Sequence, residues 1–551
     1  MNTILSYRRE DRRKGCSDLV TMEIRKPDTE GKFMNGAEVL VQTAVRAGVD
    51  VCFANAGTTE IHVVKAMEKI PGIRPRLCLF EGGCSGAADG YARMTGKPAM
   101  TLLHLGPGFA NAVANFHNAR RAGTPIFNVI GDHATWHRPS DPLLNMDLES
   151  LVGTVSGWTR TCDSVFRISS DAAAGISAAL SGRIATLILP SDCSWTEVMS
   201  PQIATAGFSF DPVEKTSIDE AAQLLLSSFR TALFLGGRAL QKAGLQAAVR
   251  VADSAGCDLL TDVFPPRMER GAGYPVVKKI PYFPEAASEL LSGYDALVFA
   301  GAREPVAFFG YQDMPGCLLS PGQRRVHIGT GNQDEVEALE CLADALNAQP
   351  SPVPDSPLIA SYSRPPLPGG RLTAETVCQA LAALQPENAI VVDESLTSGF
   401  VYYAMSAGVA PFTLLTLTGG AIGQGIPSAT GAAIACPERP VIDFQADGSA
   451  LYTLQSLWNQ ARENLNVTTL ICSNRSYNII RAEMKRAGFS PTGPVSDCLV
   501  NLDHPEIDWV RLGQGFGVPS MSAFTVEELA DGFSRALEEP GPHLIELVLQ
   551  A

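Results

Sequence analysis

Two polar residues stand where neighbouring strands of a predicted parallel sheet end. Residues 442–445 predict a short buried strand followed by Asp447, and residues 467–472 predict a second one followed by Asn474. The segment between them has helical apolar spacing, so the unit is strand–helix–strand and its two strand ends lie side by side. A carboxylate and an amide oxygen there suit a hard divalent cation that takes further ligands from phosphates, and the Gly448-Ser449 turn offers N–H groups to the same anion. The stretch therefore predicts a magnesium–diphosphate site at the carboxyl edge of a sheet.

This spacing resembles the signature of the thiamine-diphosphate enzymes, in which Gly-Asp-Gly is followed roughly 25–30 residues later by an Asn-Asn or similar pair. The first glycine is replaced here by Ala446, whose methyl group crowds the turn. An ordinary strand–turn–helix with a surface aspartate is the alternative. The resemblance implies that Mg²⁺ is bound by Asp447, Asn474 and the backbone carbonyl of Ser476. It also assigns cofactor contacts to residues of this stretch: Ala446, Gly448, Ser449, Asn474, Tyr477, Asn478 and Ile479.

Composition excludes several classes of protein. The chain has 551 residues, 45% of them hydrophobic and 18% charged, which is a globular composition too large for one core. Its net charge of −15 argues against nucleic acid and anionic membranes as partners. No apolar run reaches the roughly 20 residues of a membrane span. The 13 cysteines are scattered without a CxxC pair, so neither a zinc site nor a disulfide framework is predicted, and we expect a cytoplasmic protein.

Strand and helix patterns alternate from Met34 onward, which predicts an α/β fold of three doubly wound parallel-sheet domains. Residues 1–33 are expected to form a flexible extension; the charged run at 8–14 is not followed by an apolar segment, which argues against a secretory signal. With the resemblance included, the predicted domains are a pyrimidine-binding domain at 34–200, a middle domain at 212–347, a linker at 348–371 and a diphosphate-binding domain at 372–551. Buried strands are predicted at 51–54, 77–80, 99–104, 126–130, 185–189, 231–235, 258–261, 296–301 and 325–328.

Glu81 is the second candidate for chemistry. It ends the predicted strand 77–80 and is followed by the small residues Gly82, Gly83 and Gly86, which let a flat group approach. A carboxylate in that setting loses hydration, which favours its neutral form; pairing with Arg93 is the alternative. The run EGGCSGAADGYAR resembles the pyrimidine-binding helix of thiamine enzymes. The resemblance implies that Glu81 shares a proton with the aminopyrimidine ring and so activates the cofactor.

Two further segments resemble cofactor-binding parts of this family. The glycine-rich segment 420–427 implies that Gly420 contacts the cofactor and that Ile422 props it in its bent form; a core isoleucine is the alternative. Glu394 and Ser395, which follow a predicted strand, resemble a loop on the diphosphate side.

A turn and a histidine resemble the substrate side of benzoylformate decarboxylase. The turn 55–60 (NAGTTE) assigns Gly57 to the cofactor and the hydroxyl of Thr58 to the substrate carboxylate. His104, at the end of the strand 99–104, matches an active-site histidine, and a histidine there can move protons near neutral pH. A buried histidine bonded to the backbone is the alternative.

Other positions depart from the family. Where a second histidine is expected the chain has Gly310-Tyr311, so that acid–base group is absent or replaced by Tyr311. His133 is a candidate without an assigned role. The segment 479–484 lacks the bulky aromatic residues of an aryl-selective pocket. The Gly236-Gly237 turn is a weak dinucleotide signal, and we prefer helix–strand packing as its explanation.

The resemblance covers the chain from Met34 and is closest to the acetolactate synthases and benzoylformate decarboxylases. It implies a thiamine-diphosphate- and Mg²⁺-dependent enzyme that cleaves or joins C–C bonds beside the carbonyl of a 2-oxo acid. It also implies a homodimer or homotetramer with active sites between subunits. Decarboxylation and carboligation are not ranked by the sequence. A C–C hydrolase, a flavin-containing synthase and a catalytically degenerate binding subunit are the other possibilities.

Overall fold

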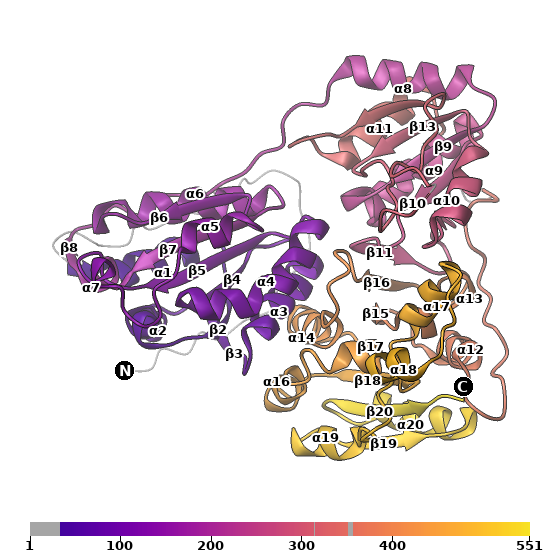
Figure 1. The fold of residues 1–551 in the computed structure, drawn as a ribbon. Helices are drawn as coiled ribbons and strands as arrows, with labels where there is room; N and C mark the ends of the chain where they lie inside the picture. The colour runs from indigo at the N-terminus through magenta and orange to yellow at the C-terminus, as the bar shows by residue number, and fades with distance from the viewer. Residues whose placement is uncertain (1–32, 313, 351–355, 551) are drawn as a thin grey trace, which may run out of the picture.

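The protein folds into three α/β units that follow one another along the chain (Figure 1). A computed structural model describes residues 33–312, 314–350 and 356–550. The extension predicted at residues 1–33 lies almost wholly outside these residues, as does part of the predicted linker. Among the described residues, no helix combines the length and apolar character needed to cross a membrane.

The N-terminal unit is a six-stranded, all-parallel sheet with helices on both faces. Its central strands are buried along their whole length, as a parallel sheet covered on both faces requires. One face packs against α1, α2 and α6, and the other against α3, α4 and α5. A short antiparallel pair, β1 with β8, lies apart from this sheet. In sheet order the strands are β3 (Arg74–Leu77), β2 (Val51–Asn55), β4 (Ala99–His104), β5 (Ile126–Asp132), β7 (Ile184–Pro190) and β6 (Trp158–Thr161). The other elements named here are α1 (Gly36–Arg46), α2 (Ile61–Lys69), α3 (Glu81–Thr95), α4 (Leu105–Ala122), α5 (Leu148–Gly153), α6 (Ile168–Leu180), β1 (Phe33–Asn35) and β8 (Glu197–Met199).

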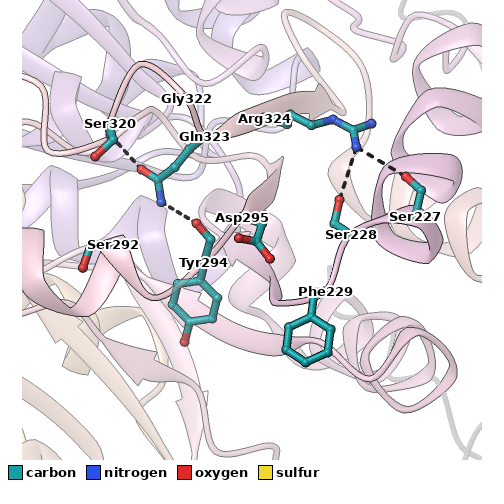
Figure 2. Close-up of a pocket in the computed structure, with 10 residues that line it drawn as sticks. All are labelled: Ser227, Ser228, Phe229, Ser292, Tyr294, Asp295, Ser320, Gly322, Gln323 and Arg324. Atoms are coloured by element: carbon teal, nitrogen blue, oxygen red, sulfur yellow. Dashed lines mark hydrogen bonds between the residues drawn. The ribbon is translucent and has the colours of Figure 1, made fainter.

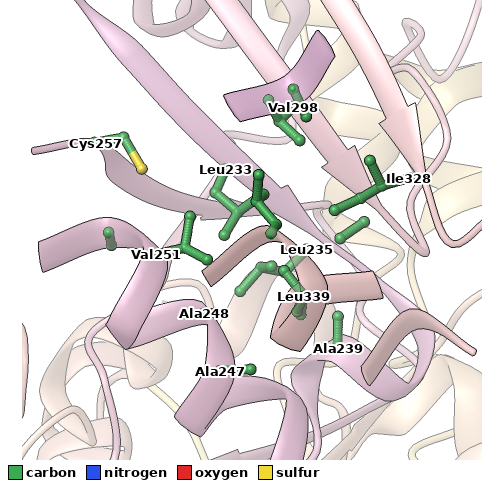
Figure 3. Close-up of a cluster of buried hydrophobic side chains, with 14 of the residues drawn as sticks. Leu233, Leu235, Ala239, Ala247, Ala248, Val251, Cys257, Val298, Ile328 and Leu339 are labelled. Atoms are coloured by element: carbon green, nitrogen blue, oxygen red, sulfur yellow. The ribbon is translucent and has the colours of Figure 1, made fainter. Parts of the chain in front are cut away.

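The middle unit is a five-stranded parallel sheet whose apolar core lies under α8, α9 and α11. Figure 3 shows side chains from the strands and helices meeting there, among them Leu233, Val298 and Leu339. The strands are, in sheet order, β12 (Lys278–Lys279), β10 (Asp258–Thr261), β9 (Thr231–Leu235), β13 (Ala296–Ala300) and β14 (Arg324–Ile328). The helices are α8 (Lys215–Ser227), α9 (Lys242–Ala255), α10 (Pro284–Ser292) and α11 (Glu335–Ala345).

The C-terminal unit is a seven-stranded sheet, parallel except at one edge. One face packs against α12 and α20, and the other against α14 and α16. In sheet order the strands are β11 (Arg267–Arg270), β16 (Phe412–Thr416), β15 (Ile390–Glu394), β17 (Val441–Ala446), β18 (Val467–Ser473), β20 (His543–Val548) and β19 (Ser520–Ala523). The helices are α12 (Ala374–Leu384), α14 (Gly425–Ala435), α15 (Asp447–Ala450), α16 (Ser456–Arg462), α17 (Asn478–Arg486), α18 (Pro494–Val500), α19 (Trp509–Gly515) and α20 (Val526–Glu538).

The N-terminal and C-terminal units meet where α3 lies along α14 (Figure 1). The two helix backbones touch: a Cβ on Gly90 would lie 2.0 Å from the carbonyl oxygen of Ser428, and one on Gly431 would lie 1.9 Å from that of Ala87. Small residues on both helices therefore allow this approach. The contact between α3 and α14 fixes how the N-terminal sheet lies relative to the C-terminal sheet.

Most predicted strands are present, and two expectations were wrong. The strand predicted at 77–80 ends at Leu77, because β3 is an edge strand and Leu77 and Leu79 are exposed by 42% and 44%. Glu81 is accordingly the first residue of helix α3. The apolar run was mistaken for a buried strand.

The second difference concerns the segment Arg267–Arg270. It lies within the range predicted for the middle domain but forms β11, which pairs antiparallel with β16 in the C-terminal sheet. Glu269 is buried and accepts from Thr413 Oγ1 on β16 at 2.7 Å, whereas the buried Met268 packs in the apolar core of the middle unit, so this strand joins the two units. Four residues without strong periodicity gave no signal for this.

Candidate functional site

Asp447 and Asn474 lie at the carboxyl ends of two adjacent parallel strands. Strands β17 and β18 are paired up to Ala446 and Cys472, as the strand–helix–strand pattern predicts. Asp447 is buried, and its carboxylate accepts from the backbone N–H groups of Gly448 (2.8 Å) and Arg475 (2.6 Å). The bond from Arg475 ties the turn after β17 to the turn after β18.

These residues fit a magnesium–diphosphate group. Burial raises the pKa of Asp447 to about 6, and a bound cation would offset that cost of charge. The amide oxygen of Asn474 accepts from Ser476 N at 2.9 Å, which holds it at the same edge. The hydroxyl of Ser449 is buried and has no hydrogen-bond partner among the described residues, so it has a proton to donate to a phosphate oxygen. A Cβ on Gly448 would lie 2.5 Å from the ring of Tyr477, so the turn needs a glycine here.

The remaining assignments of this stretch surround the same turns. Ala446 is buried at the end of β17, Tyr477 and Ile479 are half-buried, and Asn478 is exposed at the start of α17. The carbonyl oxygen of Ser476 accepts from Asn478 N at 2.9 Å and retains a second lone pair for a metal ion. Among the described residues no three His, Cys, Asp or Glu side chains gather as a metal cluster. The proposed ligand set uses one carboxylate.

Glu394 holds the glycine-rich segment 420–427 through hydrogen bonds to its backbone. Its carboxylate accepts from the backbone N–H groups of Gly423 (2.7 Å), Gln424 (3.3 Å) and Gly425 (2.6 Å). Both Gly420 and Gly423 have the positive φ angles (74° and 95°) that favour glycine. The side chain of Glu394 therefore points into the protein, where its hydrogen bonds fix the conformation of the loop.

Two other predicted cofactor contacts differ in where their side chains lie. The hydroxyl of Ser395 is buried and donates to Asp393 at 2.5 Å, so it too points into the protein. Ile422 is half-buried and belongs to none of the apolar clusters of the described residues, which leaves part of its side chain free to contact a ligand.

Glu81 begins helix α3 and is half-buried. Its Oε2 accepts from Asn111 Nδ2 at 3.0 Å, on helix α4. The alternative partner Arg93 instead pairs with Asp89 at 2.6 Å, deep in the protein. Within the part of the chain that the structure describes, the carboxylate of Glu81 is thus held by one neutral donor and remains available to a further partner.

His104 ends β4 beside a buried glutamate, Glu60. The Nδ1 atom of His104 lies 2.8 Å from Glu60 Oε2 and 3.1 Å from Thr59 Oγ1. The hydrogen bond to Glu60 is the main cause that raises the pKa of His104 above its ordinary value of 6.5, while partial burial opposes it. Glu60 also accepts from Gly57 N at 2.7 Å and from Thr59 Oγ1 at 2.5 Å. The carboxylate is fully enclosed by these donors.

Two glycines make room for this pair. A Cβ on Gly57 would lie 2.5 Å from the His104 ring, and one on Gly131 would lie 1.8 Å from Glu60 Oε1. Leu105, directly after His104, has a φ of 55°, a conformation that costs on the order of 1–3 kcal/mol in a non-glycine residue. The surrounding structure therefore imposes the position of the histidine.

The structure brings Glu81 and His104 together. A Cβ on Gly108 would lie 3.2 Å from Glu81 Oε1 and 3.6 Å from the Cβ of His104. Thr58, predicted to serve the substrate, is exposed in the same turn, while the hydroxyl that meets His104 belongs to Thr59. Glu60 was not predicted; the signal was a glutamate in the NAGTTE turn after a buried strand.

Tyr311 and His133 occupy different surroundings. The hydroxyl of Tyr311 donates to Glu483 Oε1 on α17 at 3.0 Å, and the guanidinium of Arg486 lies 3.6 Å above its ring. Burial and Glu483 together raise the pKa of Tyr311. His133 packs against His137, with ring centroids 5.7 Å apart. Tyr311 thus joins the middle unit to the helix that follows the Asn474 turn.

A separate cavity of about 510 Å³ lies at the amino ends of the middle strands (Figure 2). Arg324 reaches the hydroxyls of Ser227 and Ser228 across it, at 3.4 Å each. None of its lining residues belongs to the predicted site.

Comparison with known proteins gives a class that agrees with this geometry. Residues 34–151 match the thiamine pyrophosphate enzyme N-terminal TPP binding domain, and residues 402–547 match the C-terminal TPP binding domain. The fold and these two domains define a thiamine pyrophosphate enzyme with mixed α/β units.

Relatives narrow the class. A Mycobacterium tuberculosis protein named "Putative acetolactate synthase large subunit IlvX" is 46% identical over 524 residues, 94% of this chain and 99% of that protein. Benzoylformate decarboxylase of Pseudomonas aeruginosa is 28% identical, covering 92% of this chain and 97% of that enzyme. The chain belongs to the thiamine pyrophosphate-dependent family of acetolactate synthases and benzoylformate decarboxylases. A Rhodococcus jostii thiamine diphosphate-dependent 4-hydroxybenzoylformate decarboxylase shares the fold, with a TM-score of 0.81 at 24% identity over 94% of this chain and 99% of that one.

Proposed function

We propose that the protein is a Mg²⁺- and thiamine-diphosphate-dependent decarboxylase of a 2-oxo acid. The observation that carries the choice of decarboxylation is the His104–Glu60 pair beside Glu81. A histidine whose pKa is raised holds a proton near neutral pH, which a decarboxylase needs in order to protonate its product carbon. Benzoylformate decarboxylase is one of the relatives.

Each group of the chain has a stated part in this reaction. Bound thiamine diphosphate supplies a carbon nucleophile and an electron sink next to the substrate carbonyl. Asp447, Asn474 and the Ser476 carbonyl hold Mg²⁺, with Ser449 and the Gly448 turn at the phosphates. Glu81 holds or releases a proton toward the aminopyrimidine. His104 moves a proton at its Nε2 atom, because Nδ1 is engaged by Glu60.

Carboligation is the second candidate, favoured by the relative named as an acetolactate synthase subunit. The two activities separate in one assay: purified protein with thiamine diphosphate and Mg²⁺ is given a panel of 2-oxo acids, and CO₂, aldehyde and acyloin are measured. Aldehyde in step with CO₂ supports the decarboxylase; acyloin or acetohydroxy acid in its place supports the carboligase. Absence of cofactor binding by calorimetric titration would leave a degenerate binding subunit.

We expect Mg²⁺ removal to abolish activity and re-addition to restore it, because one carboxylate and two neutral oxygens hold the diphosphate through the metal. Asp447→Asn should raise the Mg²⁺ concentration needed for half-maximal activity by at least about tenfold, the lower end of the cost of disturbing a metal site. The measurement is a Mg²⁺ titration after chelation. Asp531→Asn, on the exposed face of α20, is the control; equal titrations for both variants would contradict the assignment.

We expect the purified protein to show no flavin absorption. At the carboxyl edge of the middle sheet the order reverses between β9 and β13, which is the usual place for a nucleotide phosphate. There the side chain of Glu335 fills the crevice: a Cβ on Gly237 would lie 2.9 Å from its Oε1, and one on Gly301 would lie 2.7 Å from its Cγ. A carboxyl group at this point disfavours a phosphate. A visible flavin spectrum released on denaturation would overturn this and favour the flavin-containing synthase.

A further inference from the structure

Four polar side chains lie buried between the C-terminal sheet and the start of helix α14. They come from adjacent strands on one face: Glu394 on β15 is opposite Gln445 on β17, and Asp443 on β17 is opposite Thr469 on β18. All four are at most 2% exposed. Central strands of a parallel sheet are ordinarily apolar on both faces, so this layer requires an explanation.

Glu394 is the charged member of the layer. Besides the three loop N–H groups, it accepts from Gln445 Nε2 at 2.9 Å. The N–H groups of Gly423 to Gly425 belong to the start of α14, where the helix dipole is positive. Burial raises the pKa of Glu394, and these four donors act in the opposite direction. With four donors, the ionised form is the one that the surroundings satisfy.

Asp443 is in the opposite situation. Neither of its carboxyl oxygens makes a well-formed hydrogen bond in the described structure, and neither does the Oε1 atom of its neighbour Gln445. Burial, and then the charge of Glu394, raises the pKa of Asp443 well above its usual range. The hydroxyl of Thr469, opposite Asp443 on β18, acts to lower the pKa of Asp443, against these two larger causes that raise it. A buried carboxylate without donors is very costly. A protonated carboxyl, by contrast, has one O–H to donate.

An acceptor for a proton on Asp443 lies nearby, at Gln445 Oε1. The point where a Cβ on Gly425 would lie is 1.9 Å from Gln445 Oε1 and 2.9 Å from Asp443 Oδ1. Gln445 Oε1 and Asp443 Oδ1, two of the three unsatisfied oxygens, therefore face the same small space, which exists because residue 425 has no side chain. One proton between them satisfies both.

We propose that Asp443 is a neutral carboxylic acid that donates to Gln445 Oε1 and thereby positions the loop beneath the cofactor. The chain of bonds runs from Asp443 to Gln445, from Gln445 to Glu394, and from Glu394 to the N–H groups of residues 423–425, next to Ile422. Asp443 is a positioning residue. The effect on cofactor binding rests on the proposed function; the protonation of Asp443 does not.

The charges around Asp443 make its ionisation unfavourable. Glu394 faces it from β15, and Asp393, also on β15, adds a second negative charge. The cations Lys279 and Arg270 lie on the side of Asp393. Helix α14 above Asp443 carries no titratable side chain from Gly425 to Ala435. Raising the pH therefore places two adjacent carboxylates under α14 with no cation between them.

Infrared spectroscopy of the cofactor-free protein tests the proton directly. We expect a carbonyl band of a protonated, buried carboxyl at neutral pH that is lost in Asp443→Asn and kept in the exposed control Asp531→Asn. In parallel, the unfolding constant of the wild type should rise with pH relative to that of Asp443→Asn, above the ordinary carboxyl pKa of 3.8, by up to about tenfold per pH unit. The sign follows because the folded state holds the proton that the unfolded chain releases.

Cofactor titration separates positioning from a merely structural role. Asp443→Asn, whose amide still donates to Gln445, should bind thiamine diphosphate as the wild type does and lose the weakening at alkaline pH. Asp443→Leu, which leaves Gln445 Oε1 unsatisfied, should bind about tenfold more weakly. A wild type without the protonated band, or equal binding by the Asn and Leu variants, overturns the proposal. If no variant or wild type binds cofactor, the proposed function fails while the infrared and unfolding results still decide the state of Asp443.

Discussion

Glu81→Gln lowers kcat/KM for every accepted 2-oxo acid by roughly 10²–10⁴-fold, the range that a positioned proton-transfer group contributes. The substitution keeps shape and an oxygen that accepts from Asn111 Nδ2, now at 3.0 Å, so helix α3 and its contacts remain. It removes the ability to carry a proton. Thiamine diphosphate binding should change little, because the residues proposed to hold the metal ion and the phosphates lie in the C-terminal unit. Steady-state kinetics and calorimetric titration measure the two effects separately.

The control is Glu68→Gln, an exposed glutamate of helix α2 paired with Lys65. It changes the same chemical group in the same unit and should leave turnover unaltered. Unchanged turnover in Glu81→Gln would refute the role of Glu81. Loss of cofactor binding along with activity would show that Glu81 serves binding and not proton transfer alone.

Mixing Glu81→Gln and Asp447→Asn, at a Mg²⁺ concentration that is limiting for Asp447→Asn, tests whether the site is shared between subunits. In the described structure no hydrogen bond joins the Glu81 side chain to residues 402–547 of its own chain, and apolar side chains such as Leu143 and Trp136 are exposed by 104% and 70%. If each site takes Glu81 from one subunit and Asp447 from the other, a Glu81→Gln and Asp447→Asn heterodimer has one intact site. Co-refolded mixtures should recover about a quarter of wild-type activity. No recovery would place both residues of a site in one chain.

The sequence predicted the parts of the fold that have strong local patterns. The apolar strands at 99–104, 231–235 and 258–261 have the predicted bounds, because fully buried parallel strands are continuous apolar runs with turn residues at their ends. Edge strand β3 was misjudged, since an exposed edge carries a mixed pattern. Strand β11 gave no signal, since its place is decided by contacts with a strand far along the chain.

For the candidate site, the sequence spacing predicted where residues lie better than it predicted which way their side chains point. The Asp447–Asn474 spacing correctly placed two turns side by side, because a strand–helix–strand unit fixes that geometry. It could not tell that the Glu394 and Ser395 side chains turn inward, since that depends on which donors surround them. Nor could it pair Glu60 with His104, which lie on different strand ends and meet only in the folded sheet. Buried partners such as Asp443 and Gln445 are likewise invisible without the third dimension.

Glu60→Gln should move the alkaline limb of the kcat profile to lower pH. The Glu60 carboxylate favours the charged imidazolium, so its removal lowers the pKa of His104 toward or below 6.5, in the direction that partial burial already acts. If protonated His104 is the proton donor, activity on the alkaline side falls about tenfold for each unit by which that pKa drops. The measurement is kcat against pH for the wild type and the variant.

Three matched variants separate positioning from stability. His104→Ala should abolish the alkaline limb of the kcat profile and lower kcat by roughly 10²–10⁴-fold. Glu60→Asp keeps the charge and should keep the limb near its wild-type place. Thr59→Val removes a hydroxyl that lies 3.1 Å from His104 Nδ1 and donates to Glu60 at 2.5 Å, but it keeps the carboxylate, so it should shift the limb less than Glu60→Gln does. The stabilisation from the Glu60–His104 pair is present below pH 6.5 and is lost as pH rises through the raised pKa of His104, so a structural role would show as altered unfolding in that window. A Glu60→Gln enzyme with lowered stability and an unmoved limb would therefore assign Glu60 to the fold and leave His104 without the partner that sets its proton.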